Sequence, residues 1–241
     1  MDSSASGDTQ RLRELLEHNI GAVRARIAGA AARAGRNPDD VTVVAVTKTV
    51  DISRIKLAYE LGLRDFGENR IQEAESKLPF LEIRAAWHLV GHLQTNKARD
   101  AVRLFDIIHS IDSLRIAEAV DRHASALGKR MPILLEANIA GEETKSGIAP
   151  EGLPAQVEGI VGLAHVEVQG LMTIAPIGPR PEAARPYFRR LRELRDSLEL
   201  RFPGIAWRHL SMGMTDDFEV AVEEGATLVR IGRAIFGERP Q

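Results

Sequence analysis

The sequence predicts an α/β protein built as a single (β/α)8 barrel of the TIM type, with an additional helix before the first strand. The length of 241 residues suits one such barrel, which typically takes about 250 residues. Short apolar segments alternate with amphipathic helical segments along the chain, and this alternation favours parallel strands joined by right-handed crossovers. A doubly wound open sheet is the alternative, but it rarely needs eight such units.

The helix before the first strand is predicted over residues 8–35, where apolar side chains recur at helical spacing until Gly35 and Asn37-Pro38. Residues 41–46 form a nearly continuous β-branched run, which is typical of a strand buried on both faces. The other strands are predicted at residues 65–67, 87–90, 105–109, 132–137, 166–172, 207–210 and 227–231. The other helices are predicted at residues 52–61, 68–78, 113–127, 182–200 and 217–224, followed by a short terminal helix after Arg233.

The amino-acid composition excludes several classes of protein. Hydrophobic residues make up 44%, charged residues 27%, and the net charge is −2, which is typical of a soluble globular protein and argues against a nucleic-acid or membrane-surface binder. The chain has no cysteine, so disulfides, thiolate metal sites and cysteine nucleophiles are excluded. No apolar run is long enough to span a bilayer. A cytoplasmic protein is therefore predicted.

The ends of the chain are assigned from the same patterns. Residues 1–7 are small and polar, without the apolar segment of a secretory signal, and are predicted to form a disordered tail. Residues 8–241 contain no long polar linker and are predicted to form one domain.

In a barrel of this type the functional site lies at the carboxyl ends of the strands. Lys48 directly follows the first predicted strand. An ammonium group at the mouth of a buried strand is partly desolvated, which favours the neutral amine and its attack on a carbonyl group. The alternative is an ordinary strand-end lysine that extends to solvent. Position alone favours that alternative.

Two glycine-containing segments follow the last two predicted strands. Ser211, Met212 and Gly213 leave the seventh strand, and Gly232 and Arg233 leave the eighth. Glycine lets the backbone approach an anion closely, and barrels often bind a phosphate group at these two strands. The alternative is that both glycines only permit tight turns. Together, opposite a lysine after the first strand, the two segments predict an anion site and strengthen the assignment of Lys48.

Arg230 lies in the middle of the last predicted strand and points to the face opposite Val229 and Ile231. A charge at that position needs a partner or a ligand. A structural ion pair with a carboxylate of a neighbouring strand is the alternative.

Other candidates are weaker. His88 and His92 are four residues apart but do not share a helical face, and with no HExxH pattern a metal site is not expected. The arginines between residues 185 and 201 are expected on a solvated helix face rather than at a nucleic-acid interface.

Several motifs occur in order between about residues 10 and 238, at or near the predicted strand ends. They are Ala-Val-Thr-Lys (45–48), Phe-Gly-Glu-Asn (66–69), Trp-His-Leu-Val-Gly-His-Leu-Gln-Thr-Asn-Lys (87–97), Gly-Glu-Glu-Thr-Lys-Ser-Gly (141–147), Gly-Leu-Met-Thr-Ile (170–174), Leu-Ser-Met-Gly-Met (210–214) and Val-Arg-Ile-Gly (229–232). This pattern resembles that of the pyridoxal 5′-phosphate (PLP) homeostasis proteins, also called the proline synthase co-transcribed homologues. That family is related to the N-terminal domain of alanine racemase.

The resemblance implies a fold-type III PLP barrel in which Lys48 holds the cofactor as a Schiff base. Arg230 is implied to face the ring nitrogen, and a permanently charged donor there keeps that nitrogen unprotonated and the ring a poor electron sink. Arg70 stands where the family often has an aromatic residue, which affects only local packing. The other residues implied to hold or line the cofactor are Asn69 and Met212, with Ser211, Gly213, Gly232 and Arg233 around the phosphate.

The resemblance implies a PLP carrier in vitamin B6 homeostasis without turnover of its own. A small amino-acid racemase is the alternative, but racemisation needs a second acid/base group on the other face of the ring. In alanine racemases that group is a tyrosine from a second domain, which is not expected after Gln241. The tyrosines of this chain, Tyr59 and Tyr187, lie in predicted helices away from the strand ends.

Further partners are expected to be few. Apo forms of PLP enzymes are possible recipients of the cofactor, and neither nucleic acid nor membrane is expected. A monomer is favoured. Lys145 and Lys97 remain open as secondary sites for PLP.

Overall fold

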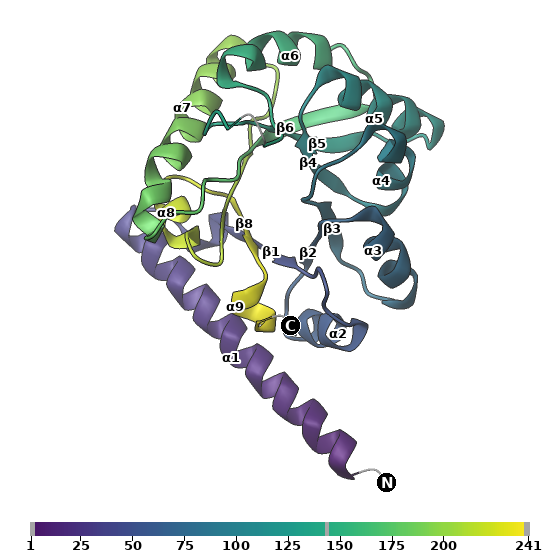
Figure 1. Ribbon diagram of the computed structural model, residues 1–241, viewed down its shortest axis with the longest axis vertical. Helices are drawn as coiled ribbons and strands as arrows, with labels where there is room; N and C mark the ends of the chain where they lie inside the picture. The colour runs from purple at the N-terminus through teal and green to yellow at the C-terminus, as the bar shows by residue number, and fades with distance from the viewer. Residues whose placement is uncertain (1–2, 143–144, 239–241) are drawn as a thin grey trace.

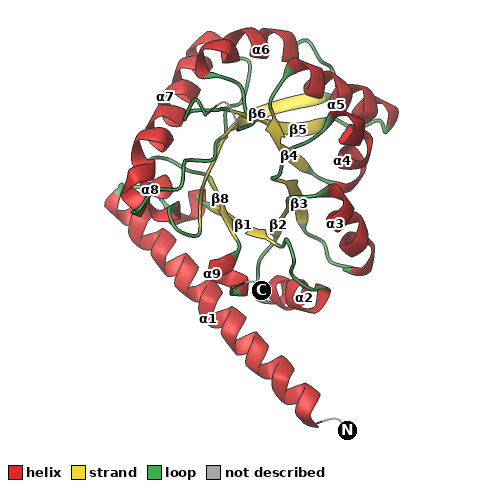
Figure 2. Ribbon diagram, viewed as in Figure 1, coloured by secondary structure: helices red, strands yellow, loops and turns green. Residues whose placement is uncertain are grey.

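The computed structural model of the protein describes residues 3–142 and 145–238. Eight parallel strands form a closed barrel in sequence order, and helices surround it (Figures 1 and 2). The predicted barrel with an additional N-terminal helix is thereby confirmed. The strands are β1 (Thr42–Val46), β2 (Asp65–Glu68), β3 (Ala86–Leu89), β4 (Ile107–Ile111), β5 (Met131–Glu136), β6 (Val166–Met172), β7 (His209–Met214) and β8 (Leu228–Ile231).

The helices lie on the outside of the barrel (Figure 2), and all but the first and the last of them connect successive strands. They are α1 (Ser3–Arg33), α2 (Ile52–Glu60), α3 (Ile71–Lys77), α4 (Ala98–Leu104), α5 (Leu114–Ala126), α6 (Leu153–Ile160), α7 (Arg185–Arg201), α8 (Phe218–Glu223) and α9 (Arg233–Phe236). Short 3-10 segments occur at Pro38–Asp40, Leu78–Phe80, Thr95–Lys97, Pro150–Gly152 and Pro181–Ala184. Within the described ranges no helix is long and apolar enough to cross a membrane.

Strand β1 closes the barrel because it pairs with both β2 and β8. Side chains alternate between two cores, as successive residues of a strand point to opposite faces. One core lies between the strands and the helices and includes Ala45 and Phe66. A smaller apolar cluster consists of residues that alternate with that core and face the barrel interior, namely Val44, Val46, Val90, Ile107, Leu134, Met172 and Leu228.

Helix α1 packs across the outside of the barrel against α8, α9 and α2. Its buried side chains recur at helical spacing, as predicted, and include Leu16, Ile20 and Ile27. The helix begins at Ser3, so residues 3–7, which were expected to form a disordered tail, are its first turns. Those turns project beyond the barrel in Figure 1. Residues 1–2 and 239–241 lie outside the described residues.

Several boundaries differ from the prediction. Strand β4 covers Ile107–Ile111 rather than 105–109, and β7 covers His209–Met214 rather than 207–210. Helix α3 begins at Ile71 because Glu68 still belongs to β2. The sequence prediction missed α4 and α6, each of which has only two turns and buries a few small or branched side chains.

Candidate functional site

A cavity of about 300 Å³ opens at the carboxyl ends of β1, β7 and β8. This is the end of the barrel at which sites in such folds form. Among the residues predicted to bind a cofactor, those that line the cavity are Lys48, Asn69, Arg230, Gly232 and Arg233. The cavity therefore brings together the lysine and the two arginines singled out from the sequence.

Lys48 follows β1 in a tight turn. The amide of Thr47 donates to the carbonyl oxygen of Gly67 (2.9 Å), and the amide of Val50 donates back to the carbonyl oxygen of Thr47 (2.9 Å). Thr49 has a positive φ of 65°, a conformation that side chains other than glycine seldom adopt. The turn leaves Lys48 half-buried at the cavity wall.

An ion-paired cluster lies beside this turn. The Nζ atom of Lys77 donates to the carbonyl oxygen of Thr47 (2.8 Å), to Oε1 of Glu68 (3.1 Å) and to Oε1 of Glu73 (2.6 Å). Burial raises the pKa of Glu68, while its bond from Thr47 and the charge of Lys77 lower it. Lys77 and Glu68 were missed in the sequence because α3 must first pack on β2 to join them. The cluster connects the ends of β1 and β2, which carry Lys48 and Asn69.

Arg230 is buried in the barrel interior, with 5% of its surface exposed. Its Nη1 donates to Oγ of Ser211 (2.6 Å) and its Nη2 donates to the carbonyl oxygen of Thr173 (2.9 Å). Burial lowers the pKa of Arg230 to about 10, although Asp217 and Glu136 act in the opposite direction. No carboxylate of the described residues forms an ion pair with it, so the alternative of a structural ion pair is not supported. The guanidinium keeps further N–H donors at the cavity.

Ser211, Met212 and Gly213 are placed differently from the prediction. They belong to β7 and do not line the cavity, whereas Met214 at the end of the strand does. Ser211 points into the barrel toward Arg230, and Met212 points outward into the core beneath the helices. Gly213 has a φ of 91°, and a Cβ atom there would lie 2.5 Å from Cβ of Ala221. This glycine therefore permits the close approach of α8.

The rim of the cavity carries both charged and apolar side chains. Arg233 forms ion pairs with Asp216 (2.5 Å) and Glu238 (3.5 Å). Ile177, which also lines the cavity, is fully exposed. The mixture of polar and apolar side chains is typical of a binding site for a small molecule.

Asn69 is held against the end of β3 by a close backbone contact. A Cβ atom on Gly91 would lie 2.1 Å from the carbonyl oxygen of Asn69. No side chain fits at this position, so Gly91 allows the two strand ends to approach each other at the cavity.

The weaker candidates lie apart from the cavity. His88 points into the barrel interior, whereas His92 contacts Asp112 (3.4 Å) and Ser146 (3.1 Å). The described residues contain no group of three or more side chains that could hold a metal ion. Lys145 pairs with Glu142 (2.7 Å), and neither it nor Lys97 lines the cavity. Residues 143–144 of the motif at 141–147 lie outside the described residues.

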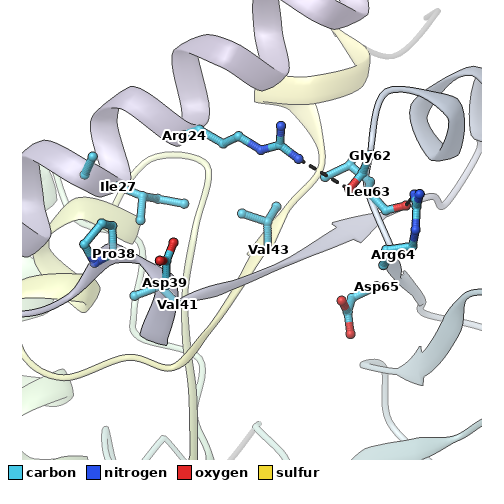
Figure 3. A pocket seen from close by; sticks show the side chains of 11 residues that line it. Arg24, Ile27, Pro38, Asp39, Val41, Val43, Gly62, Leu63, Arg64 and Asp65 are labelled. Carbon is cyan, nitrogen blue, oxygen red and sulfur yellow. Dashed lines mark hydrogen bonds between the residues drawn. The ribbon is translucent and has the colours of Figure 1, made fainter.

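A second hollow of about 420 Å³ lies between α1 and the amino ends of β1 and β2. Figure 3 shows Arg24 donating to the carbonyl oxygen of Gly62 at its edge, with Val43 and Asp65 on the strands. Because ligands of such barrels bind at the carboxyl ends of the strands, this hollow is not the candidate site.

The fold and the cavity define a class of barrels related to the racemases. The family model described as the N-terminal domain of alanine racemase matches residues 17–240, nearly the whole chain. An alanine racemase of Clostridium difficile shares the fold, with a TM-score of 0.73 and 16% identity, over 95% of this chain and 60% of that one.

Relatives with higher sequence identity identify the family within this class. A pyridoxal phosphate homeostasis protein of Aquifex aeolicus is 45% identical over 215 residues, which are 89% of this chain and 94% of the relative. The structure of PipY from Synechococcus elongatus with PLP bound has a TM-score of 0.82 and 36% identity, over 92% of this chain and 100% of that one. The chain belongs to the family of pyridoxal phosphate homeostasis proteins.

Proposed function

We propose that this protein binds PLP in the cavity at the carboxyl ends of β1, β7 and β8 and serves PLP homeostasis. The observation that carries the proposal is the buried cation of Arg230, which faces the same cavity as Lys48 without a carboxylate partner among the described residues. A buried charge of this kind needs a ligand or strong dipoles. The relatives named as PLP homeostasis proteins and the PLP-bound PipY support the same ligand.

Each group of the cofactor has a counterpart in the cavity. Lys48 would hold the aldehyde carbon through its side-chain amine, and Arg230 would donate to the ring nitrogen. Gly232 and Arg233 would hold the phosphate, since a backbone amide and a guanidinium both suit that anion. Asn69 lines the same cavity. When bound, PLP supplies a carbonyl group that reacts with amines, together with a conjugated ring.

Ser211, Met212 and Gly213 have indirect roles in this proposal. Ser211 acts through Arg230, to which it is hydrogen-bonded. Met212 packs behind β7, and Gly213 shapes the end of that strand.

We further propose that the protein carries PLP without turning over a substrate. A guanidinium at the ring nitrogen leaves that nitrogen unprotonated and disfavours carbanion chemistry. Neither tyrosine borders the cavity: Tyr59 of α2 stacks with Arg64 at 4.3 Å, and Tyr187 lies in α7. The relatives are named as homeostasis proteins rather than as enzymes. Transfer of PLP to apo enzymes, a monomeric state and a cytoplasmic location stay predictions.

Covalent binding is tested by mass spectrometry. The full-length protein is mixed with PLP, reduced with borohydride and measured intact, and its peptides are then mapped. We expect one reduced PLP adduct per chain, on Lys48. An unmodified chain after reduction, with no binding by fluorescence, would contradict the proposed function.

The carrier function and the racemase function are distinguished by whether the protein changes the chirality of amino acids. The PLP-loaded protein is incubated with single enantiomers of several amino acids, and the enantiomer ratio is followed by chiral chromatography. We expect no change beyond that of free PLP. Turnover at about 1 per second or faster, in the range of ordinary enzymes, would favour the racemase.

The phosphate subsite gives a separate prediction. Arg233→Ala removes a cation and leaves Asp216 and Glu238 unpaired beside the phosphate. We expect the dissociation constant for PLP to rise about tenfold, the loss of one charge-assisted hydrogen bond. Pyridoxal, which has no phosphate, is the control ligand and should bind both proteins alike. Equal weakening for both ligands would place the phosphate elsewhere.

A further inference from the structure

A continuous row of hydrogen-bonded side chains crosses the barrel interior from Asp65 on β2 to Arg230 on β8. Oδ1 of Asp65 lies 3.1 Å from Nε2 of His88, and Nδ1 of His88 lies 2.9 Å from Nε2 of His109. Nδ1 of His109 lies 2.9 Å from Oγ of Ser211, which accepts the bond from Arg230. We call Asp65, His88, His109 and Ser211 the polar row.

Burial keeps the middle of the row away from water. His109 and Ser211 are 0% exposed, and 28% of the Asp65 side chain is exposed. Asp65 borders the second hollow in Figure 3. The row thus runs from the amino end of the barrel to the proposed cofactor cavity at the other end.

The chemistry of the two ends is compatible with one continuous order of donors and acceptors along the row. At the amino end the carboxylate of Asp65 only accepts, so His88 must donate from Nε2 and a neutral His88 accepts at Nδ1. His109 then donates from Nε2 and accepts at Nδ1 from the hydroxyl of Ser211. At the other end the guanidinium of Arg230 only donates, so Ser211 accepts from it, and the hydroxyl hydrogen of Ser211 is then available to donate to Nδ1 of His109. This order of protons satisfies both ends of the row, and it is the order that we expect.

The neutral state of His109 has its own cause. Burial depresses the pKa of His109 well below its ordinary value, and the permanent charge of Arg230 acts in the same direction. A neutral imidazole donates at one nitrogen and accepts at the other, as the row requires.

A polar row is unusual in this place. The interior of such a barrel is normally filled with layers of branched aliphatic side chains, as Ile107 and Leu134 do here. Aliphatic residues would fill the space without the need to satisfy buried donors and acceptors. The row ends on Arg230, the buried group that lines the cavity, and this connection suggests a role at the cavity.

We propose that the polar row is a positioning device, which holds the guanidinium of Arg230 in one orientation as a donor toward the ring of the bound cofactor. The inference rests on the proposed function. Ser211 and the carbonyl oxygen of Thr173 fix the two Nη atoms of Arg230, and the row fixes Ser211. None of the four residues touches the cofactor in this proposal, so they act through Arg230.

The proton order is tested first, on the full chain with and without PLP. Side-chain nitrogen NMR distinguishes the two neutral tautomers of histidine from the cation. We expect His88 and His109 to carry their protons on Nε2 at neutral pH in both states. A proton on Nδ1 of either residue, or a charged His109, would overturn the row.

The positioning role is tested with Ser211→Ala, and Ser110→Ala is the matched control. Ser110 is equally buried, but its hydroxyl donates to the carbonyl oxygen of Gly91 outside the row. Both variants lose one buried hydroxyl. We expect only Ser211→Ala to weaken PLP binding, by about tenfold, and to shift the pH midpoint at which the visible absorption band of bound PLP changes.

Two variants of Asp65, at the end of the row away from Arg230, test whether the whole row is needed. Asp65→Asn keeps an oxygen that accepts from His88, so PLP affinity and the absorption band should match those of the wild type. Asp65→Leu removes the acceptor and should reproduce the band shift of Ser211→Ala.

The outcomes separate the two proposals. A wild-type protein that binds no PLP contradicts the proposed function. A wild-type protein that binds PLP, while Ser211→Ala behaves like Ser110→Ala in affinity and spectrum, overturns the positioning role alone.

Discussion

Replacing Lys48 with alanine is expected to abolish the covalent adduct with PLP and to raise its dissociation constant by about a hundredfold. The variant loses the only lysine amine that lines the cavity among the described residues, and with it the bond to the aldehyde carbon. The contacts with the phosphate and the ring would remain, so weak non-covalent binding should persist. A factor of one hundred corresponds to about 2.7 kcal/mol. Intact mass after borohydride reduction and the visible absorption band measure the two effects.

Lys145→Ala and Lys97→Ala are the control variants. Both lysines lie outside the cavity, and Lys145 is paired with Glu142, so we expect both variants to retain the adduct. Circular dichroism should show the same fold for all three proteins. An adduct that persists in Lys48→Ala and disappears in Lys145→Ala would move the attachment to the loop after β5.

The second large effect is expected at Glu136, at the end of β5. Its side chain is buried, with 7% of the residue exposed, and Oε2 has no hydrogen-bond partner. Burial, and then the negative charge of Asp112, raise the pKa of Glu136 to about 7, although Arg230 opposes the shift. Glu136→Gln removes the ionisation and keeps the size of the side chain. We expect the variant to be more stable than the wild type at neutral and alkaline pH.

The higher stability of the variant at neutral and alkaline pH follows from the linkage between proton binding and folding. The pKa of Glu136 is higher in the folded state than in the unfolded state, so its contribution to stability is complete below about pH 4.5 and is lost as the pH rises through about 7. The two proteins should therefore have similar unfolding free energies near pH 4. The variant should be more stable by about 2 to 3 kcal/mol above pH 7.

Urea unfolding at several pH values measures this difference. Glu118→Gln, at an exposed position of α5, is the control and should leave the pH dependence unchanged. A Glu136→Gln variant that is less stable than the wild type at pH 8 would mean that the carboxylate has a partner that stabilises its charge.

Local patterns in the sequence were enough to predict the barrel. The β-branched run at β1 and the run at β6 correspond closely to the observed strands, because burial on both faces leaves a continuous apolar signal. Helix α1 was predicted because its apolar side chains recur at helical spacing. The two-turn helices α4 and α6 were missed, since so few residues carry too weak a periodic signal.

The sequence predicted those residues of the candidate site that directly follow a strand. Lys48, Asn69, Gly232 and Arg233 each follow a strand, and parallel strands bring their carboxyl ends to one rim. The prediction placed Ser211 to Gly213 beyond β7, because a serine and a glycine do not resemble a buried strand. In the structure these residues continue β7, and Ser211 satisfies its hydroxyl inside the barrel.

By itself the sequence determined the closed barrel and the strand-end residues that gather at one cavity, because both depend on short-range patterns and on a general rule of strand direction. Only the tertiary structure decided the partners of Arg230 and the order of the polar row. His109 and Ser211 are 102 positions apart in the chain, on strands β4 and β7. No local pattern records a hydrogen bond that forms only when the barrel closes.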